Sequence, residues 1–426
     1  MASINLSLQI GNGRVTSMDK ANNKEQLVLV INSGSSSIKY EIFSFPDEMP
    51  MLHGEVSGIG SEHAKHVIHL KELGQQELAI EDDSCALQTQ ADGFNAILAA
   101  LSRFHDTIKA LDISVIGHRV VHGGDEFITP TLINESVISK IERFNHLAPL
   151  HNPNSLLGIN MCSTFFSGVP QVAVFDTSFH QTIPEHVYRY AIPQSWYQEH
   201  KIRRYGFHGT SHQYVAQQTA HLLNRPLSEL NLISLHLGNG ASVCAIQQGK
   251  SIDTSMGFTP LEGLIMGSRS GDIDASIPLY IQEKSGLASE EVELLLNTES
   301  GLKALAGTSD VSHLLELEKT GDQAAKLALD SYVYRIRKYI GAYLVTLGHV
   351  DALIFTAGIG ENVSDIRDRC CNDLEMFGIQ LDPILNTQQI EQSAFIDSGS
   401  PTRIMVIRTN EELQIANEAR QIISAE

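Results

Sequence analysis

The sequence predicts an α/β protein built from two domains. Strand-like apolar runs alternate along the chain with segments of helical periodicity, which is typical of α/β folds. One plan, in which a strand, a turn rich in glycine and serine, and a second strand follow one another, occurs twice and indicates an internal duplication. At 426 residues the chain also exceeds the size that one hydrophobic core usually supports. We therefore expect two domains with a cleft between them.

The repeated plan is a hairpin with a tip of small residues. Residues 32–37 (NSGSSS) form the tip of the first copy, and residues 238–242 (GNGAS) form that of the second. A third unit is a buried-type strand at residues 352–356 that leads into a glycine-rich turn at residues 357–362 (AGIGEN). The strands that flank the two tips are predicted at residues 26–31 and 38–43 and at residues 232–237 and 243–246.

Helices are predicted between these units and at the C-terminus. Residues 403–408 are expected to form a strand and residues 411–423 the last helix, with Thr409 and Glu412 as its capping box. Two core-facing helices are predicted from apolar side chains at helical spacing, which are Phe94, Ile97, Leu98, Leu101 and Phe104 in the first and Tyr332, Ile336, Ile340, Tyr343 and Leu347 in the second.

Composition and charge restrict the partners that the chain can have. Thirty Lys and Arg residues against 50 Asp and Glu residues give a formal net charge of −20, which disfavours nucleic acid and anionic membrane surfaces. No apolar run approaches the roughly 18 residues that a membrane-spanning helix needs. Residues 1–26 lack the features of a signal peptide and are interpreted as a variable extension. The five cysteines contain no C-x-x-C motif, and the adjacent Cys370 and Cys371 are interpreted as buried thiols, so we expect a soluble, cytoplasmic protein.

The motifs point to phosphate binding by hairpin tips. The sequence contains neither a P-loop motif nor G-x-G-x-x-G, so those two modes of nucleotide binding lose their usual support. Glycine and serine in a hairpin tip allow close approach of the backbone, and its N–H groups and hydroxyls can surround an anion. One such tip is common in proteins, but two related tips and a third glycine-rich turn favour a phosphate site in the cleft.

This layout resembles the superfamily of actin, heat-shock chaperone ATPases and sugar kinases, which have two duplicated actin-like (ribonuclease H-like) domains with a nucleotide cleft between them. Within it the chain resembles the acetate kinase family along nearly its whole length from about residue 27. The matching runs are residues 30–39 (VINSGSSSIK), 117–124 (GHRVVHGG), 147–153 (LAPLHNP), 175–180 (FDTSFH), 204–212 (RYGFHGTSH), 236–240 (HLGNG), 253–257 (DTSMG), 260–263 (PLEG), 267–272 (GSRSGD) and 355–362 (FTAGIGEN).

The resemblance implies transfer of the ATP γ-phosphate to acetate, and it assigns the catalytic side chains. Arg119 and Arg269 are the pair implied to grip the acyl carboxylate and the transferring phosphoryl group, a role suited to the planar guanidinium. His208 is implied to donate a hydrogen bond to the phosphoryl oxygens, which makes His208 and Arg269 the transition-state stabilisers. Asp176 is implied to organise the reacting centre. His151 is also expected near the active site.

Metal, nucleotide and acceptor sites follow from the same resemblance. Asn32 and Glu411 are implied to hold Mg²⁺, for which Mn²⁺ could substitute. A small apolar acceptor pocket is implied at Val121, Leu150, Phe207 and Pro260, together with Arg119. The ATP-binding residues implied are Lys39, His236, Asn239, Gly240, Asp310, Gly358, Ile359 and Asn362.

The chain departs from the family at the nucleotide end. The family commonly has an arginine near the adenosine, where this chain has Ser312 in the run 309–312 (SDVS). GTP, other triphosphates and pyrophosphate therefore stay open as donors.

Two rival functions and several structural questions remain at this stage. Propionate kinase shares nearly every motif, and pocket size at Val121 separates the two activities. A nucleotide-driven binding module of the chaperone or actin kind is the rival from another class, and the two arginine motifs disfavour it.

We expect a homodimer, with residues 27–176 and 411–426 in domain I and residues 177–410 in domain II. The remaining histidines of the motifs, which are His118, His122, His180 and His212, are interpreted as hydrogen-bonded core residues and not as metal ligands.

Overall fold

The computed structural model describes residues 26–34, 36–70, 78–81, 87–103, 113–149 and 151–425. The predicted extension up to residue 25, together with Cys85, Phe104 and Leu150, lies outside the described residues. None of the helices in the described part of the chain combines the length and apolar character that a membrane crossing requires.

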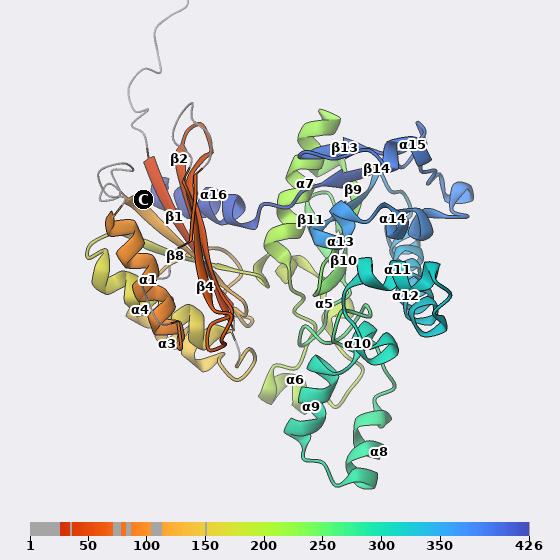
Figure 1. The fold of residues 1–426 in the computed structure, drawn as a ribbon, viewed down its shortest axis with the longest axis horizontal. Helices are drawn as coiled ribbons and strands as arrows, with labels where there is room; N and C mark the ends of the chain where they lie inside the picture. Colours follow the sequence, from red (N-terminus) through yellow and green to blue (C-terminus); the bar gives the residue numbers. More distant parts are fainter. Residues whose placement is uncertain are drawn as a thin grey trace, which may run out of the picture.

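Two sheets organise the described chain, and Figure 1 shows them side by side. The first has the strand order β5-β4-β3-β2-β1-β6-β8-β7, and the second has the order β11-β10-β9-β12-β14-β13. The strands of the first sheet are β1 (Gln26–Ser33), β2 (Ser37–Phe45), β3 (Met49–Ser57), β4 (Lys65–Leu70), β5 (Leu78–Glu81), β6 (Ile113–Val120), β7 (Thr131–Leu132) and β8 (Gln171–Phe175). Those of the second are β9 (Asn231–Leu237), β10 (Ala241–Gln247), β11 (Lys250–Thr254), β12 (Ala352–Thr356), β13 (Ser393–Phe395) and β14 (Arg403–Ile407).

The two sheets contain the same central arrangement. In the first, β1 pairs antiparallel with β2 and parallel with β6, and β6 pairs parallel with β8. In the second, β9 pairs antiparallel with β10 and parallel with β12, which pairs parallel with β14. The duplication predicted from the two hairpin tips is therefore confirmed, and the fold consists of two duplicated actin-like domains. The exact domain boundaries stay a prediction.

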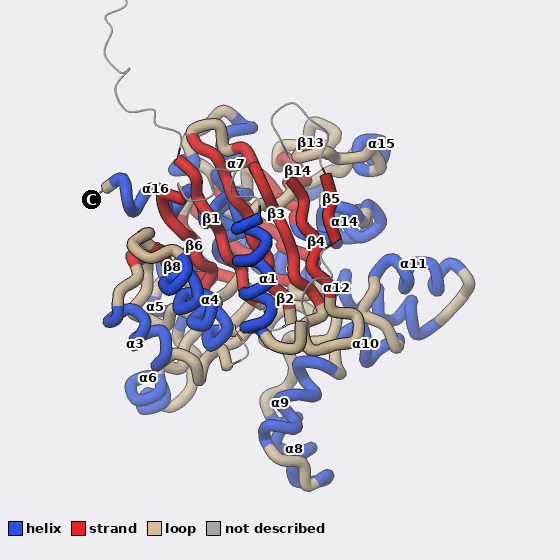
Figure 2. The backbone as a smooth tube through the Cα atoms, turned by 60° about the vertical axis from the view of Figure 1, so that its left-hand side comes forward, coloured by secondary structure: helices blue, strands red, loops and turns tan. Residues whose placement is uncertain are grey.

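Helices cover both faces of each sheet, as the alternation of apolar side chains requires. On β1, Leu27 and Leu29 face the core that α1 and α4 complete, whereas Val28 and Val30 face α16. In the second sheet α7 packs on one face and α12 on the other. Figure 2 shows the first sheet in red with α1 and α4 in front of it.

The helices have the following bounds. They are α1 (Gln90–Arg103), α3 (Glu135–Arg143), α4 (Asn152–Phe165), α5 (Glu185–Tyr188), α6 (Gln194–His200), α7 (Gly209–Leu223), α8 (Ser276–Ser285), α9 (Ser289–Thr298), α10 (Gly301–Ala306), α11 (Val311–Lys319), α12 (Gln323–Leu347), α13 (Ala357–Asn362), α14 (Ser364–Cys371), α15 (Pro383–Asn386) and α16 (Glu411–Ser424), with short 3-10 helices at Ser178–Thr182, Leu227–Glu229 and Glu375–Phe377.

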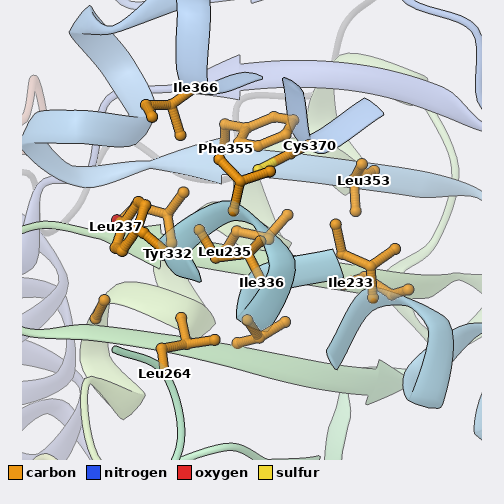
Figure 3. Close-up of a cluster of buried hydrophobic side chains, with 14 of the residues drawn as sticks. Ile233, Leu235, Leu237, Leu264, Tyr332, Ile336, Leu353, Phe355, Ile366 and Cys370 are labelled. Carbon is orange, nitrogen blue, oxygen red and sulfur yellow. The ribbon is translucent and has the colours of Figure 1, made fainter. Parts of the chain in front are cut away.

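The largest core lies between the second sheet and α12. Figure 3 shows Tyr332 and Ile336 of α12 packed against side chains of β9 and β12, including Leu235 and Phe355. Cys370 and Cys371 are both buried within this core, and burial raises the pKa of both thiols. The interpretation of this pair as buried thiols is confirmed.

Two local predictions, one for the segment after β12 and one for the cap of the last helix, were wrong. The glycine-rich segment after β12 forms the short helix α13 and not an open turn, because Ala357 adopts a left-handed φ of 62° and its N–H donates to the Glu361 side chain. The last helix is capped by Asn410, whose side chain accepts from Leu413 N, and not by the predicted pair of Thr409 and Glu412. Both latter side chains are held elsewhere, as described below.

A buried histidine in the first sheet gives a pH-dependent stability. His118 on β6 is 1% exposed, and its Nε2 lies 2.6 Å from Gln171 Oε1. Burial lowers the pKa of His118 to about 4, although the bond to Gln171 opposes the shift. Between pH about 6.5 and about 4 the unfolded chain binds the extra proton, so the folded state loses stability as the pH falls through that window, by up to about 1.4 kcal/mol per pH unit.

The first prediction compares His118→Gln with the wild type in urea. The amide can keep a partner in Gln171 but cannot titrate, so the variant should lose stability less steeply between about pH 6 and about pH 5. Denaturation curves at both pH values measure the two slopes. Equal slopes would show that His118 does not contribute to the pH dependence.

Candidate active site

The first hairpin tip opens onto a pocket beside the first sheet. The pocket has a volume of about 410 Å³. Its lining comes from the tip, from the end of β6 and from the start of α16, and it consists of Asn32, Gly34, Ser37, Lys39, Arg119, Thr409, Glu411 and Glu412. The structure thus brings together four of the residues predicted for catalysis, metal and nucleotide, which are Asn32, Lys39, Arg119 and Glu411.

Arg119 is fixed by a bidentate ion pair at the back of this pocket. Its Nε and Nη2 donate to the two carboxylate oxygens of Asp176 at 2.8 and 2.6 Å, and its Nη1 donates to Asn32 Oδ1 at 3.1 Å. β6 and β8 are parallel neighbours, so the residues at their carboxyl ends meet at one edge of the sheet. Burial lowers the pKa of Arg119, but the carboxylates of Asp176 and Glu411 outweigh burial, and the net pKa is raised.

Carboxylates from the first turn of α16 complete this side of the site. Glu411 Oε2 lies 3.8 Å from Arg119 Nε, and Glu412 Oε1 accepts from Asn32 Nδ2 at 3.1 Å. Burial raises the pKa of Glu411 to about 7, Arg119 opposes the shift, and Asp176 adds to it. A carboxylate this strongly destabilised in its charged form is suited to a cation that would neutralise it.

The oxygen donors near Glu411 fit a hard divalent cation that keeps several waters. Among the described residues no three His, Cys, Asp or Glu side chains are arranged to enclose a metal ion. Mg²⁺ in kinases is usually held by one or two carboxylates together with waters and phosphate oxygens, which requires no such cage. The pocket supplies Glu411, Glu412 and the amide oxygen of Asn32.

Two histidines stack on each other, one before α7 and the other on β9. The rings of His208 and His236 lie 4.2 Å apart at an interplanar angle of 19°. His208 precedes α7 in a left-handed conformation, with φ at 56°, which a histidine adopts only where its surroundings hold it. Burial lowers the pKa of both rings, that of His236 to about 3 and that of His208 well below its ordinary value, and Arg119 adds to both shifts.

Arg269 is the second arginine of the predicted pair, and it is half-buried. Its Nη1 donates to Pro260 O at 3.3 Å, and no ion pair to it occurs within the described residues. Burial lowers its pKa. Both arginines lower the pKa of His151, to about 4 after the larger effect of burial, so both cations face this ring. A half-buried cation with only neutral partners is suited to an anionic ligand.

The second hairpin tip lies against these groups. A side chain on Gly240 would approach both Arg269 Nη1 and His208 Nε2 to 3.5 Å, so the tip sits beside them. Asn239 O accepts from Gly267 N at 3.1 Å, and its side chain lies over Gly267, where a larger residue would find no room.

The other predicted nucleotide residues lie at the N-terminus of α11 and along α13. Asp310 is the N-cap of α11, and its Oδ1 accepts from Ser312 N and His313 N at 2.8 and 3.3 Å. Gly358 and Asn362 are exposed on α13, and Asn362 Nδ2 donates to Gly358 O. Ile359, also on α13, is half-buried.

The predicted acceptor pocket is apolar and closely packed. Val121 is 7% and Phe207 2% exposed, and Pro260 is half-buried where its carbonyl accepts from Arg269. The His122 ring contacts Phe207 edge-on, with centroids 5.5 Å apart. Leu150, the fourth predicted member, lies outside the described residues.

The histidines interpreted as core residues are buried and hydrogen-bonded. His118 pairs with Gln171, His122 Nδ1 accepts from Gly124 N, His180 lies between Ser251 and Phe207 O, and His212 lies between Ser234 and Ser242.

Sequence reasoning missed a set of polar residues that hold the segment between β14 and α16. Glu361 Oε1 accepts from Ala357 N at 2.8 Å and from Thr409 N at 3.0 Å. The Thr409 hydroxyl lies 2.8 Å from Ser211 Oγ, which in turn lies 2.8 Å from His236 Nδ1. The segment after β14 is therefore tied to α13 and to His236 immediately before Glu411. Both Glu361 and Ser211 fall in the motif runs, which was the available signal.

The chain matches the family described as "Acetokinase family" over residues 27–417. The chain belongs to the acetokinase family. The match spans both sheets and extends from Asn32 to Glu411, so the whole pocket lies within the acetokinase region.

Relatives of the acetokinase family are similar to this chain over nearly their full length. An acetate kinase of Halothermothrix orenii is 45% identical over 93% of this chain and 100% of its own length. An acetate kinase of Thermotoga maritima is 46% identical over 93% of this chain and 98% of its own.

Solved acetokinase structures share the fold. Porphyromonas gingivalis acetate kinase has a TM-score of 0.84 at 38% identity, covering 93% of this chain and 100% of its own. A propionate kinase of Francisella tularensis has a TM-score of 0.84 at 40% identity, covering 93% and 99%.

Proposed function

We propose that this protein is an acetate kinase, which reversibly transfers the γ-phosphoryl group of ATP to acetate and gives acetyl phosphate and ADP. The observation that carries the proposal is the pair of arginines, one locked to Asp176 and the other without a carboxylate partner among the described residues. Guanidinium groups suit a small anionic acceptor and a transferring phosphoryl group. A neutral sugar hydroxyl would not require them.

The chemistry needs positioning and charge neutralisation more than proton transfer. An acetate oxygen attacks the γ-phosphorus, the bond to the bridging oxygen breaks, and ADP leaves with that electron pair. Acetate is already ionised at neutral pH, so no general base is required. Asp176 accordingly serves to orient Arg119, and its tight ion pair is suited to that role. Arg269 and His208 would stabilise the equatorial oxygens of the phosphoryl group.

Mg²⁺ would be held by Glu411 and Asn32, with Glu412 close by. When bound, it would neutralise charge on the β- and γ-phosphate oxygens. Lys39 on the first tip and Asn239 and Gly240 on the second tip would contact the phosphates, because the two tips offer backbone N–H groups to anions.

We infer that the nucleotide base would bind near α11 and α13. Gly358, Ile359 and Asn362 would flank the base, and Asp310 would lie near the ribose. Ser312 stands where relatives of this family commonly have arginine, so the donor is tested directly by comparing ATP, GTP and pyrophosphate.

The main assay incubates the protein with each donor and with acetate, propionate or butyrate, and traps the acyl phosphate as a hydroxamate. Acetyl hydroxamate as the main product supports acetate kinase. Donor hydrolysis that does not depend on any acid, without acyl phosphate, would overturn it in favour of a nucleotide-driven binding module.

Propionate kinase is the second candidate, because a propionate kinase of 40% identity has the same fold. The size of the acceptor pocket decides between the two acids. Val121 is buried and presents two methyl groups where the acyl chain would end.

A second prediction therefore concerns Val121→Ala. Removing the two methyl groups should raise the ratio of propionate to acetate kcat/KM by about tenfold, since a methylene is worth about 1–3 kcal/mol in such pockets. Kinetics with the two acids measure the ratio. If the ratio does not change, Val121 does not line the acyl end of the pocket.

We also propose a homodimer formed through the arm that α8 and α9 make. Figure 2 shows this arm projecting from the body of the molecule. α8 buries none of its residues, and Leu279, Tyr280 and Leu294 are 69%, 59% and 59% exposed. An apolar surface of this kind, on a projecting element, is typical of protein interfaces.

A third prediction tests the arm with Leu279→Glu combined with Leu294→Glu. Two buried charges at an apolar interface should convert a dimer into a monomer, which light scattering after gel filtration measures. Met376→Glu, at a residue that is 84% exposed on another part of the surface, is the matched control and should leave the mass unchanged. A double variant that stays dimeric would place the interface elsewhere.

A further inference from the structure

A chain of three buried polar side chains leads from the second sheet to His208. Ser234 Oγ lies 2.9 Å from His212 Nδ1, His212 Nε2 lies 2.8 Å from Ser242 Oγ, and Ser242 Oγ lies 2.9 Å from His208 Nδ1. Ser234, His212 and Ser242 are each 0% exposed. The other ring nitrogen of His208, Nε2, faces Gly240 at the second hairpin tip.

The number of hydrogens in this chain is fixed. Burial lowers the pKa of His208 and of His212 well below the ordinary value, and the neighbouring imidazoles add to the shift, so both rings are neutral. A neutral imidazole has one N–H donor and one acceptor nitrogen, and a serine hydroxyl has one hydrogen to donate. The Ser242 hydroxyl contacts two ring nitrogens and has no other hydrogen-bond partner among the described residues, so it donates to one ring and accepts from the other. The three contacts therefore all run in one direction.

Only one direction gives every buried hydrogen an acceptor. If the chain ran from His208 toward Ser234, the Ser234 hydroxyl hydrogen would need a further acceptor, and among the described residues its oxygen has His212 as its one hydrogen-bond partner. A buried hydroxyl left in that state is unfavourable. In the opposite direction Ser234 donates to His212, His212 donates to Ser242, and Ser242 donates to His208 Nδ1. The hydrogen on His208 Nε2 then points toward the site.

We propose that Ser234, His212 and Ser242 are positioning residues that hold His208 in the tautomer with its hydrogen on Nε2. His208 is then a neutral donor toward the phosphoryl oxygens before any substrate binds, which saves reorganisation during the reaction. This inference rests on the proposed function for its consequence, because the role of His208 as a donor belongs to that function. The tautomer itself is a property of the protein alone.

The test reads the tautomer by NMR in protein labelled with ¹⁵N-histidine and without substrates. His208→Asn assigns the signals, since asparagine tolerates the left-handed backbone at this position. In the wild type His208 should have a bare Nδ1 and a protonated Nε2. Ser234→Ala removes the hydroxyl that starts the chain, and Ser242→Ala removes the link to His208, so both variants should show a mixture of tautomers. The opposite tautomer in the wild type, or the unchanged tautomer in both variants, would show that this chain does not set the tautomer of His208.

Kinetics separate a positioning role from a merely structural one. Ser242→Ala should lower kcat by about tenfold while KM for acetate changes less than about twofold, because the acceptor pocket is untouched. Ser251→Ala is the matched control, since Ser251 is an equally buried serine that contacts His180 and has no contact with His208. It should leave the His208 tautomer unchanged. Ser234→Ala acts far from any ligand and keeps the test valid if Ser242→Ala does not fold.

The proposed function and the proposed tautomer of His208 can fail separately. If the wild type forms no acyl phosphate but shows the Nε2–H tautomer, the proposed function is wrong and the positioning of His208 by the chain stands. If acyl phosphate forms and the tautomer is the opposite one, the positioning of His208 alone is wrong.

Discussion

Arg119→Ala is expected to lower kcat by at least about 10³-fold and to destabilise the protein by about 3 kcal/mol. The activity falls because the variant loses the cation that would face acetate and the phosphoryl group. The stability falls because Asp176, with a side chain only 2% exposed, loses both hydrogen bonds from the guanidinium and is left as a buried carboxyl group without its partner. Hydroxamate formation and urea denaturation measure the two effects.

Arg119→Lys is the matched control for this prediction. Lysine restores the positive charge but cannot donate to both carboxylate oxygens and to Asn32 at the same time. It should recover much of the stability and little of the activity. An alanine variant with near wild-type kcat would remove Arg119 from the reacting centre.

Arg269→Met is expected to lower kcat by about 10²–10³-fold with almost no change in stability. Arg269 carries a half-buried charge and donates to the neutral carbonyl of Pro260, and burial lowers its pKa. Replacing such a cation by an apolar side chain of similar length is often neutral or stabilising. The two arginines should therefore affect activity alike and stability differently.

The measurement is a pair of urea denaturation curves beside the same assay. If Arg269→Met destabilises the protein as much as Arg119→Ala, then Arg269 contributes mainly to the folded state and its assignment as a stabiliser of the transition state would need revision.

The fold could be predicted well because its signals are local. The hairpins around the two tips depend on apolar strands and small turn residues, and the structure confirms both as β1 with β2 and β9 with β10. The duplication followed from the repetition of that plan. The segment after β12 was harder, because a run of glycines does not reveal that the Glu361 side chain, four residues ahead, accepts from Ala357 N and closes a helical turn.

The candidate site was predictable as a list of residues and less so as a geometry. Side chains with motif support, such as Arg119 and Glu411, do line one pocket. No local pattern indicates that Arg119 has Asp176 as a partner, because that contact joins the ends of parallel strands distant in sequence. Nor does any local pattern indicate that Arg269 has no carboxylate partner among the described residues. The same holds for Thr409, which was predicted as part of a helix cap and which contacts Ser211 on α7.

The position of α16 has a consequence for the order in which the protein matures on the ribosome. Its residues are synthesised after those of every other described helix and strand, yet they cover the face of the first sheet formed by Val28 and Val30 of β1. Until α16 emerges, that apolar face has no cover, whereas the strands of the second sheet are already available. The N-terminal half must therefore wait for the C-terminal one, and an incomplete chain lacks Glu411 together with the helix that would protect it from aggregation.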